Sequence, residues 1–157
     1  MLEQDLSRAL ELAPEELCTE LGSYDCVDDI HLVALGGHDP FGRGQYAPVA
    51  KPMVTTPLAV ERVVLAACSE RVARDHDERA VFTALELDGP APAATSDAFI
   101  ETVDALYQRL LSRDPIDAEY EVLAELLVDD QGEPVLAERF AAEACVAVAT
   151  TTEFIFI

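Results

Sequence analysis

Residues 57–74 read PLAVERVVLAACSERVAR, the most apolar stretch of the sequence with helical spacing. The Thr56 side chain offers an oxygen to free backbone N–H groups, and Pro57 has a preset φ angle where no N–H is needed, so both predict a helix start. On a helical wheel the apolar side chains cover an arc of about 200°. We therefore expect a helix packed between others. Glu61 and Arg71 fall inside that arc, and we expect each to reach the rim or pair with another side chain.

The segment before this helix is a long loop. Residues 36–56 read GGHDPFGRGQYAPVAKPMVTT, without the alternation of a strand. Loops of this length in small domains are usually functional or mobile. We expect this one to be ordered, because Phe41, Tyr46, Pro48, Pro52 and Met53 supply apolar surface that can pack it on the core. Two interpretations are open, a protein-binding loop and a simple cover for the core.

Helical periodicity continues on both sides. It predicts helices over residues 2–12, 14–21, 27–35, 96–113, 115–127 and 134–149, whereas residues 80–87 fit either a helical turn or a strand. The run 144–149 is apolar throughout and is expected to be buried on all sides. These patterns predict a single all-α domain over residues 1–157, with six or seven helices in an orthogonal or bundle-like arrangement. A sub-division near the Pro- and Ala-rich connector 88–96 is the alternative.

The composition limits the class of partner. The chain has 157 residues, with 31 acidic and 10 basic side chains, and a net charge of −21. Such a surface repels nucleic acid and anionic membranes, and attracts cationic proteins or metal ions. Solubility alone would also explain the charge. No apolar run is long enough to cross a bilayer, so we predict no membrane span.

Cys18, Cys26, Cys68 and Cys145 allow three disulfide pairings. The pairing that we favour joins Cys18 to Cys26 and Cys68 to Cys145. Disulfides persist in oxidising compartments, which favours a periplasmic or extracellular mature chain whose leader has been removed. If Met1 is the native start, we expect a cytoplasmic protein instead.

Several residues carry metal or catalytic chemistry in principle. The spacing Cys18-x7-Cys26-x4-His31-x6-His38 offers zinc ligands, although it matches no common zinc module. Haem bound through His31 or Met53 is a further alternative, whereas the C-x-x-C-H motif of covalent haem attachment is absent. No nucleophile motif appears, so a hydrolase of unknown substrate ranks last. The expectation is a protein without a cofactor.

The C-terminal region resembles a known group of helical domains. Residues 106–114, LYQRLLSRD, with Pro115 and Glu119, and the ending ATTTEFIF are similar to the last helices of cytochrome-associated domains of unknown function from exported bacterial proteins. The LYxxLLxRxP hairpin also resembles helical repeats of the phycobilisome-linker type. Residues 16–37 and 55–72 resemble uncharacterised exported bacterial proteins with matching cysteines. The resemblance implies export, oxidised cysteines and association with a redox or envelope assembly.

These observations favour a non-enzymatic accessory or binding protein of the bacterial envelope. We expect it to engage a protein partner, cationic or part of a redox assembly, through its acidic surface and loop 36–56. Phe41, Arg43 and Tyr46 are the expected contacts, because aromatic and Arg side chains dominate protein interfaces. The alternatives are a haem or metal carrier that uses His31 and His38, and a hydrolase.

Overall fold

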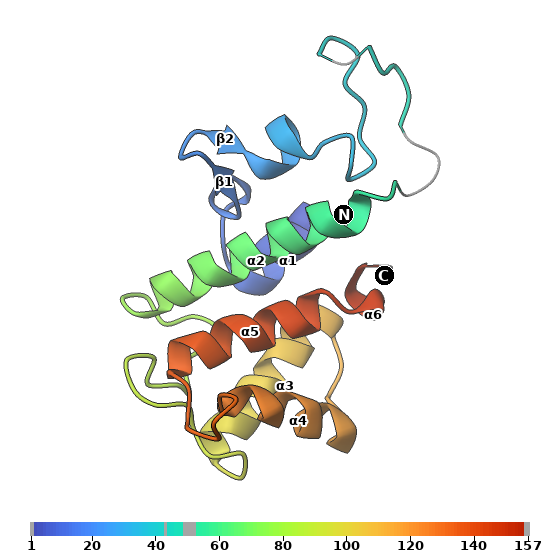
Figure 1. The fold of residues 1–157 in the computed structure, drawn as a ribbon. Helices are drawn as coiled ribbons and strands as arrows, with labels where there is room; N and C mark the ends of the chain where they lie inside the picture. The colour runs from blue at the N-terminus through green and yellow to red at the C-terminus, as the bar shows by residue number, and fades with distance from the viewer. Residues whose placement is uncertain (1, 43, 49–52, 156–157) are drawn as a thin grey trace.

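The structure, a computed structural model, describes residues 2–42, 44–48 and 53–155 (Figure 1). Its α-helices are α1 (Leu2–Leu10), α2 (Thr56–Asp75), α3 (Asp97–Leu111), α4 (Asp117–Ala124), α5 (Ala137–Ala149) and α6 (Thr152–Ile155). Two 3-10 helices, η1 (Pro14–Glu16) and η3 (Glu125–Leu127), a π-helix, η2 (Cys26–Ile30), and the short strands β1 (Thr19–Glu20) and β2 (Tyr24–Asp25) complete it. The prediction of a predominantly helical fold is confirmed. Within these ranges, no helix combines the length and the apolar character needed to cross a lipid bilayer.

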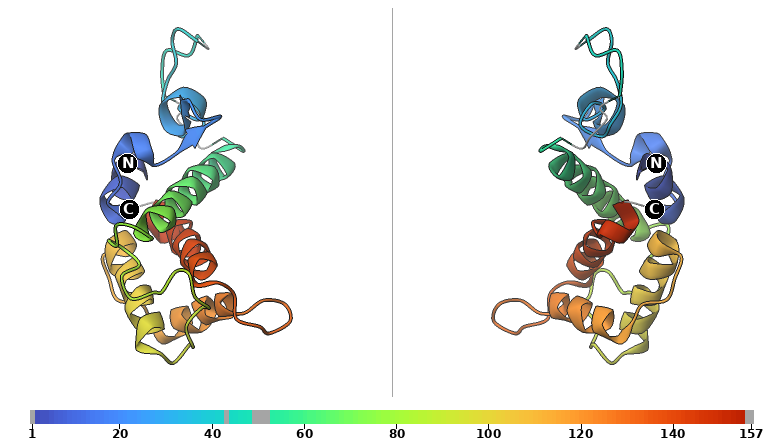
Figure 2. Two further views of the ribbon diagram at one scale, coloured as in Figure 1. Left: turned by 90° about the vertical axis from the view of Figure 1, so that its left-hand side faces the viewer. Right: turned by 90° about the vertical axis from the view of Figure 1, so that its right-hand side faces the viewer.

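The helices α2 and α5 form the centre of the molecule. They pack side by side, with α1 against α2 and α3 against α5, while α4 lies beyond α5 (Figures 1 and 2). Buried apolar side chains from α1 through α6 join in one cluster. The hairpin β1–β2, η2 and the described part of loop 36–56 lie at the opposite end from α3 and α4. This arrangement separates a helical body from an end made mostly of loops.

The start of α2 differs by one residue from the prediction. Thr55, not Thr56, is the N-cap, and its side chain makes no capping bond. The Thr56 hydroxyl accepts a hydrogen bond from the Met53 N–H at 2.9 Å and donates one to the Ala34 carbonyl at 2.7 Å. Pro57 lies in the first turn, as expected. The hydroxyl therefore ties the end of loop 36–56 to the segment before it, instead of capping the helix.

Two disulfides hold the chain together, and they are the pairs favoured from the sequence. Cys68 of α2 and Cys145 of α5 are fully buried, with Cα atoms 5.8 Å apart. This bond closes a separation of 77 residues and, in the chain-entropy model, contributes about 4.5 kcal/mol. Cys18 and Cys26 lie 5.4 Å apart and flank the β1–β2 hairpin. Both bonds favour an oxidising compartment.

The α3–α4 pair begins and ends at recognisable caps. The Ser96 hydroxyl accepts from the Phe99 N–H, and Ser112 ends α3 with a φ of 56°. Ile116 is the N-cap of α4, and the Glu119 carboxylate accepts its N–H at 2.8 Å.

Arg113 fastens this turn to the C-terminal helix. Its guanidinium donates to both carboxylate oxygens of Glu119, at 2.6 and 2.9 Å, and to both of Glu153 in α6, at 2.8 Å. It also lies over the Tyr107 ring, 5.0 Å from the centroid.

Four local predictions are wrong. The helix expected over residues 14–21 is only the 3-10 turn η1, and residues 19–25 form a hairpin, because the Cys18–Cys26 bond brings the two ends of this segment together. The helix expected over 27–35 is a π-helix that stops at Ile30, followed by turns. The run 144–149 is not buried on all sides, because Ala147 is exposed, and the last helix starts at Ala137 because Pro134 pairs with Val128 instead.

Candidate functional site

The described part of loop 36–56 begins at a glycine pair that stops the preceding turn. Gly36 has a φ of +97°, a value that side chains other than glycine rarely adopt. The Gly37 N–H donates to the Leu32 carbonyl at 2.7 Å, and a Cβ at Gly37 would collide with that same residue. The two glycines therefore let the chain leave the turn and extend outward.

The tip of the loop is a closed turn. The Asp39 side chain accepts the Gly42 N–H at 2.7 Å, and the backbone carbonyl of Asp39 accepts the Gln45 N–H at 3.0 Å. A Cβ at Gly42 would meet the Asp39 carboxylate, and Gly44 has a φ of +66°. Asp39 therefore holds two later residues of the loop, Gly42 and Gln45, by its side chain and its backbone carbonyl.

This turn presents its aromatic residue to solvent. The Phe41 side chain is 99% exposed, and Tyr46, just beyond the turn, is 81% exposed. The expectation that these two residues and Pro48 pack the loop on the core is wrong, because Pro48 is exposed too. Arg43, the third predicted contact, lies outside the described residues, as does Pro52. The side chains that a loop covering the core would bury are therefore exposed, and they offer apolar surface to a partner.

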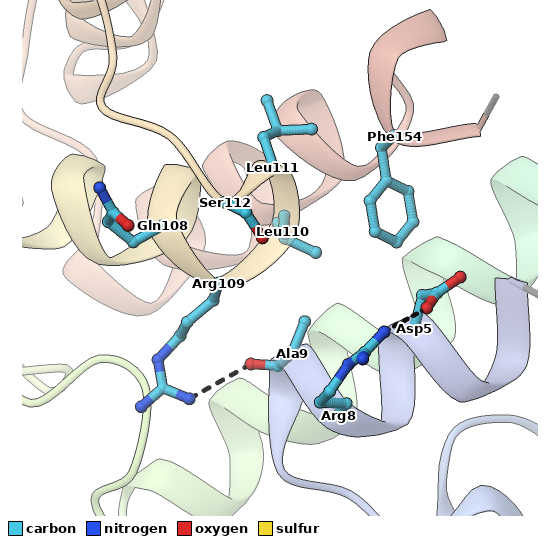
Figure 3. Close-up of a pocket in the computed structure, with 9 residues that line it drawn as sticks. All are labelled: Asp5, Arg8, Ala9, Gln108, Arg109, Leu110, Leu111, Ser112 and Phe154. Atoms are coloured by element: carbon cyan, nitrogen blue, oxygen red, sulfur yellow. Dashed lines mark hydrogen bonds and ion pairs between the residues drawn. The ribbon is translucent and has the colours of Figure 1, made fainter. Parts of the chain in front are cut away.

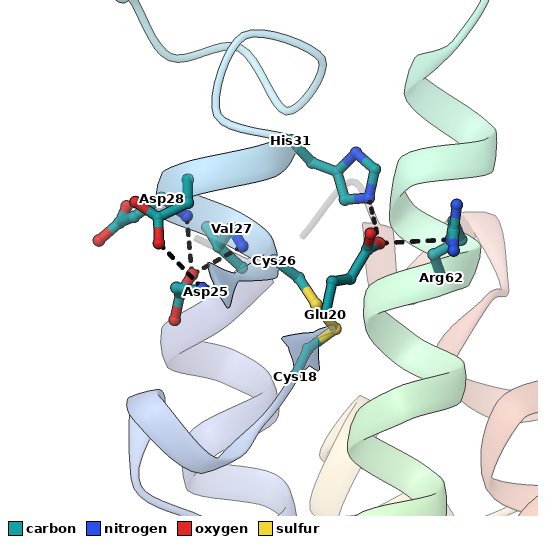
Figure 4. The surroundings of a disulfide bond; sticks show 9 residues. Cys18, Glu20, Asp25, Cys26, Val27, Asp28, His31 and Arg62 are labelled. Carbon is teal, nitrogen blue, oxygen red and sulfur yellow. Dashed lines mark hydrogen bonds and ion pairs between the residues drawn. A yellow bond between two sulfur atoms is a disulfide. The ribbon is translucent and has the colours of Figure 1, made fainter. Parts of the chain in front are cut away.

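The hairpin beside the loop is braced by carboxylates. Asp25 caps η2 by accepting the N–H groups of Val27 and Asp28, both at 2.7 Å, and Asp29 accepts the Asp25 N–H at 3.0 Å (Figure 4). Burial and the nearby charges of Asp28 and Asp25 raise the pKa of Glu3 in α1. Carboxylates thus crowd this end of the molecule.

His31 faces a carboxylate rather than the other predicted metal ligands. In Figure 4 its ring and the Arg62 guanidinium both point to Glu20, with Nε2 at 3.2 Å and Nε at 3.5 Å from Oε1. The sulfur atoms of Cys18 and Cys26 are joined to each other, and His38 is exposed in the loop. Across residues 2–42, 44–48 and 53–155, no three His, Cys, Asp or Glu side chains form a group suited to a metal ion. The four predicted zinc ligands are therefore not brought together as a set.

A polar cluster lies at the end of α2, and the sequence pattern contains only a weak signal for it. Asp75 is fully buried, binds Arg71 at 2.8 Å, and accepts the N–H groups of Ala80, Val81 and Phe82. Arg71 thus pairs with another side chain and Glu61 is exposed, both as expected. The i, i+4 spacing of Arg71 and Asp75 was the available signal. We interpret the cluster as structural, because both side chains are buried and the Asp75 carboxylate fixes residues 80–82 as a loop.

A groove of about 430 Å³ lies between α1, the end of α3 and α6 (Figure 3). It contains two arginines, but Arg8 pairs with Asp5 at 2.5 Å. Arg109 donates to the Ala9 carbonyl at 3.3 Å and to the Glu11 carboxylate at 2.6 Å. Arg109 therefore joins α3 to the end of α1, whereas Arg8 is paired within α1, so each guanidinium already has a carboxylate partner.

Comparisons of the chain with protein-family models, curated proteins and solved structures find no match. The resemblances expected from the sequence therefore stay predictions. The strongest candidate site is the end of the molecule formed by loop 36–56 and the hairpin.

Proposed function

We propose that this chain is a non-enzymatic accessory protein of the bacterial envelope that engages a protein partner through loop 36–56. The observation that carries the proposal is the 99% exposure of Phe41, beside a residue, Asp39, that accepts the N–H groups of Gly42 and Gln45. Aromatic side chains dominate interface energetics, and a turn that is already formed loses little conformational entropy on binding. Tyr46 adds a second aromatic contact at the same place.

Charge and disulfides support the remaining parts of the proposal. A net charge of −21 favours a cationic partner and disfavours nucleic acid. Two disulfides support a periplasmic or extracellular location. The haem or zinc carrier and the hydrolase receive no comparable support from a particular observation.

The test compares partner capture by three forms of the full chain. The loop variant carries Phe41→Ala and Tyr46→Ala, and the control carries Ile116→Ala and Val122→Ala, two exposed apolar positions at α4. Each tagged protein is incubated with an envelope extract of the source cells, and captured proteins are quantified by mass spectrometry. We expect one partner to be recovered with the wild type and the control and lost with the loop variant. Equal recovery with all three proteins would remove the loop from the proposal.

A further inference from the structure

One face of α2 is largely exposed among the described residues. Apart from Pro57, the exposed residues of this helix are Leu58, Glu61, Arg62, Leu65, Ser69 and Ala73. At 100° per residue they occupy a single arc of about 120°. Two large apolar side chains on this arc, Leu58 and Leu65, are 60% and 52% exposed, and Val54, just before the helix, is 95% exposed.

The same face opens into a groove beside α5. Its volume is about 280 Å³, and three small side chains, Ser69, Ala73 and Ala142, line it together with Val72, His76, Glu138 and Arg139. Small side chains let another backbone approach closely. From Leu58 to Ala73 the helix extends about 22 Å, which matches a partner helix of about 15 residues.

The charges around this face are in negative surplus. Arg62 is matched by Glu20 at 3.5 Å, and Arg139 by Glu143 at 2.7 Å. Glu61 lies at the edge of the open arc, one turn from Leu58 and one turn from Leu65 along the helix, and within the described ranges it has no ion-pair partner. A second copy of this chain, with its own charge of −21, would be repelled, whereas a basic partner would be attracted.

We propose that the face formed by Leu58, Leu65, Ser69 and Ala73, with the groove beside α5, binds an amphipathic helix of a partner protein. The apolar stripe of that helix contacts the two leucines and enters the groove, and its flanking Lys or Arg residues pair with Glu61. This mode uses anchors at i, i+3, i+4 and i+7 on the bound helix. The inference rests on the proposed function only in requiring a protein partner, because the face is separate from the tip of loop 36–56.

The probe is a synthetic helical peptide of about 16 residues, with Leu at i, i+3, i+4 and i+7 and Lys elsewhere. Its counterpart carries Glu in place of Lys. By isothermal titration calorimetry at physiological ionic strength, we expect the Lys peptide to bind with 1:1 stoichiometry and the Glu peptide not to bind. The variant Leu58→Ser with Leu65→Ser is expected to bind roughly 10–100-fold more weakly. Ala73→Trp, which fills the groove and leaves both leucines in place, should weaken binding as well.

The control variant, Ile116→Ser with Val122→Ser, is expected to bind like the wild type, and thermal unfolding verifies that every variant is folded. If neither the double leucine variant nor Ala73→Trp changes the affinity, or if the control loses as much affinity as they do, the peptide is attracted by net charge alone and the proposal is overturned. A dimer in sedimentation that Leu58→Ser with Leu65→Ser abolishes would assign the face to a second copy and overturn it too. The loop variant, Phe41→Ala with Tyr46→Ala, is expected to bind the peptide normally, so failure of the loop proposal and failure of this one are distinguishable.

Discussion

Replacement of Asp75 by alanine is expected to destabilise the protein severely. The carboxylate lies fully buried at the end of α2. Oδ1 meets Arg71 at 2.8 Å and accepts the Ala80 N–H at 2.8 Å, while Oδ2 accepts those of Val81 and Phe82 at 3.1 and 2.5 Å. One side chain thus satisfies three backbone donors and a guanidinium that is itself only 3% exposed.

The size of the expected loss of stability follows from the groups that would stay buried without their partner. Breaking a buried ion pair by removing one partner costs about 3–5 kcal/mol, because the other charge stays buried. Each buried N–H without an acceptor costs a further 1–3 kcal/mol, roughly. These costs overlap, since the same oxygens serve both, and we expect a total loss of about 4–6 kcal/mol. That is a large share of the 5–15 kcal/mol, roughly, that stabilises a typical domain.

The assay is equilibrium unfolding in guanidinium chloride without reductant, followed by circular dichroism. The control is Asp77→Ala, an exposed carboxylate two residues away, expected to change the free energy of unfolding by no more than about 0.5 kcal/mol. Adding Arg71→Met to Asp75→Ala should recover part of the loss, because the orphaned charge is removed. A loss below about 1 kcal/mol for Asp75→Ala would refute the role assigned to this carboxylate.

Three further predictions concern other parts of the fold. Cys68→Ser with Cys145→Ser is expected to lower the free energy of unfolding by about 4.5 kcal/mol in the same assay, and no loss would refute the cross-link. Hydrogen bonds from Arg113 lower the pKa of Glu119, so their contribution is present above pH ~4.3 and lost as the pH falls further. The Tm of Arg113→Gln should therefore fall less than that of the wild type on acidification, and parallel curves would contradict this. Because burial and two nearby carboxylates raise the pKa of Glu3, ionised Glu3 destabilises the fold at neutral pH. Glu3→Gln should raise the Tm at pH 7, with the difference vanishing at low pH, and a lower Tm at pH 7 would refute the repulsion.

The long helices could be predicted from the sequence because their signals are local. Residues 96–113 were expected to be helical and α3 spans Asp97–Leu111, since the apolar spacing and the Ser96 cap lie within the segment itself. Residues 57–74 likewise correspond to α2, Thr56–Asp75. The start of α4 shows the limit of such signals, because the predicted helix begins at residue 115, whereas α4 begins at Asp117 after the Glu119 carboxylate accepts the Ile116 N–H.

The remaining elements depend on contacts between residues far apart in the sequence. Residues 80–82 carry apolar side chains that suit a helical turn or a strand, yet their N–H groups are taken by Asp75. The candidate site was only partly predictable for the same reason. Phe41 was recognised as a contact residue, but hydropathy alone also favoured its burial, and only the turn closed by Asp39 explains its exposure.

Two unfavourable features meet at one end of this molecule, and together they support a role in binding. Phe41, in the turn that Asp39 closes, and Tyr46, just beyond it, expose apolar surface that the core does not use. Nearby, Asp25 and Asp28 crowd Glu3 and raise its pKa. Selection for solubility explains the carboxylates but not the exposed aromatic rings. The packing of a hydrophobic core explains neither of these two features. A partner that covers the rings and brings cations to the carboxylates would offset both costs, whereas a free chain gains nothing from either.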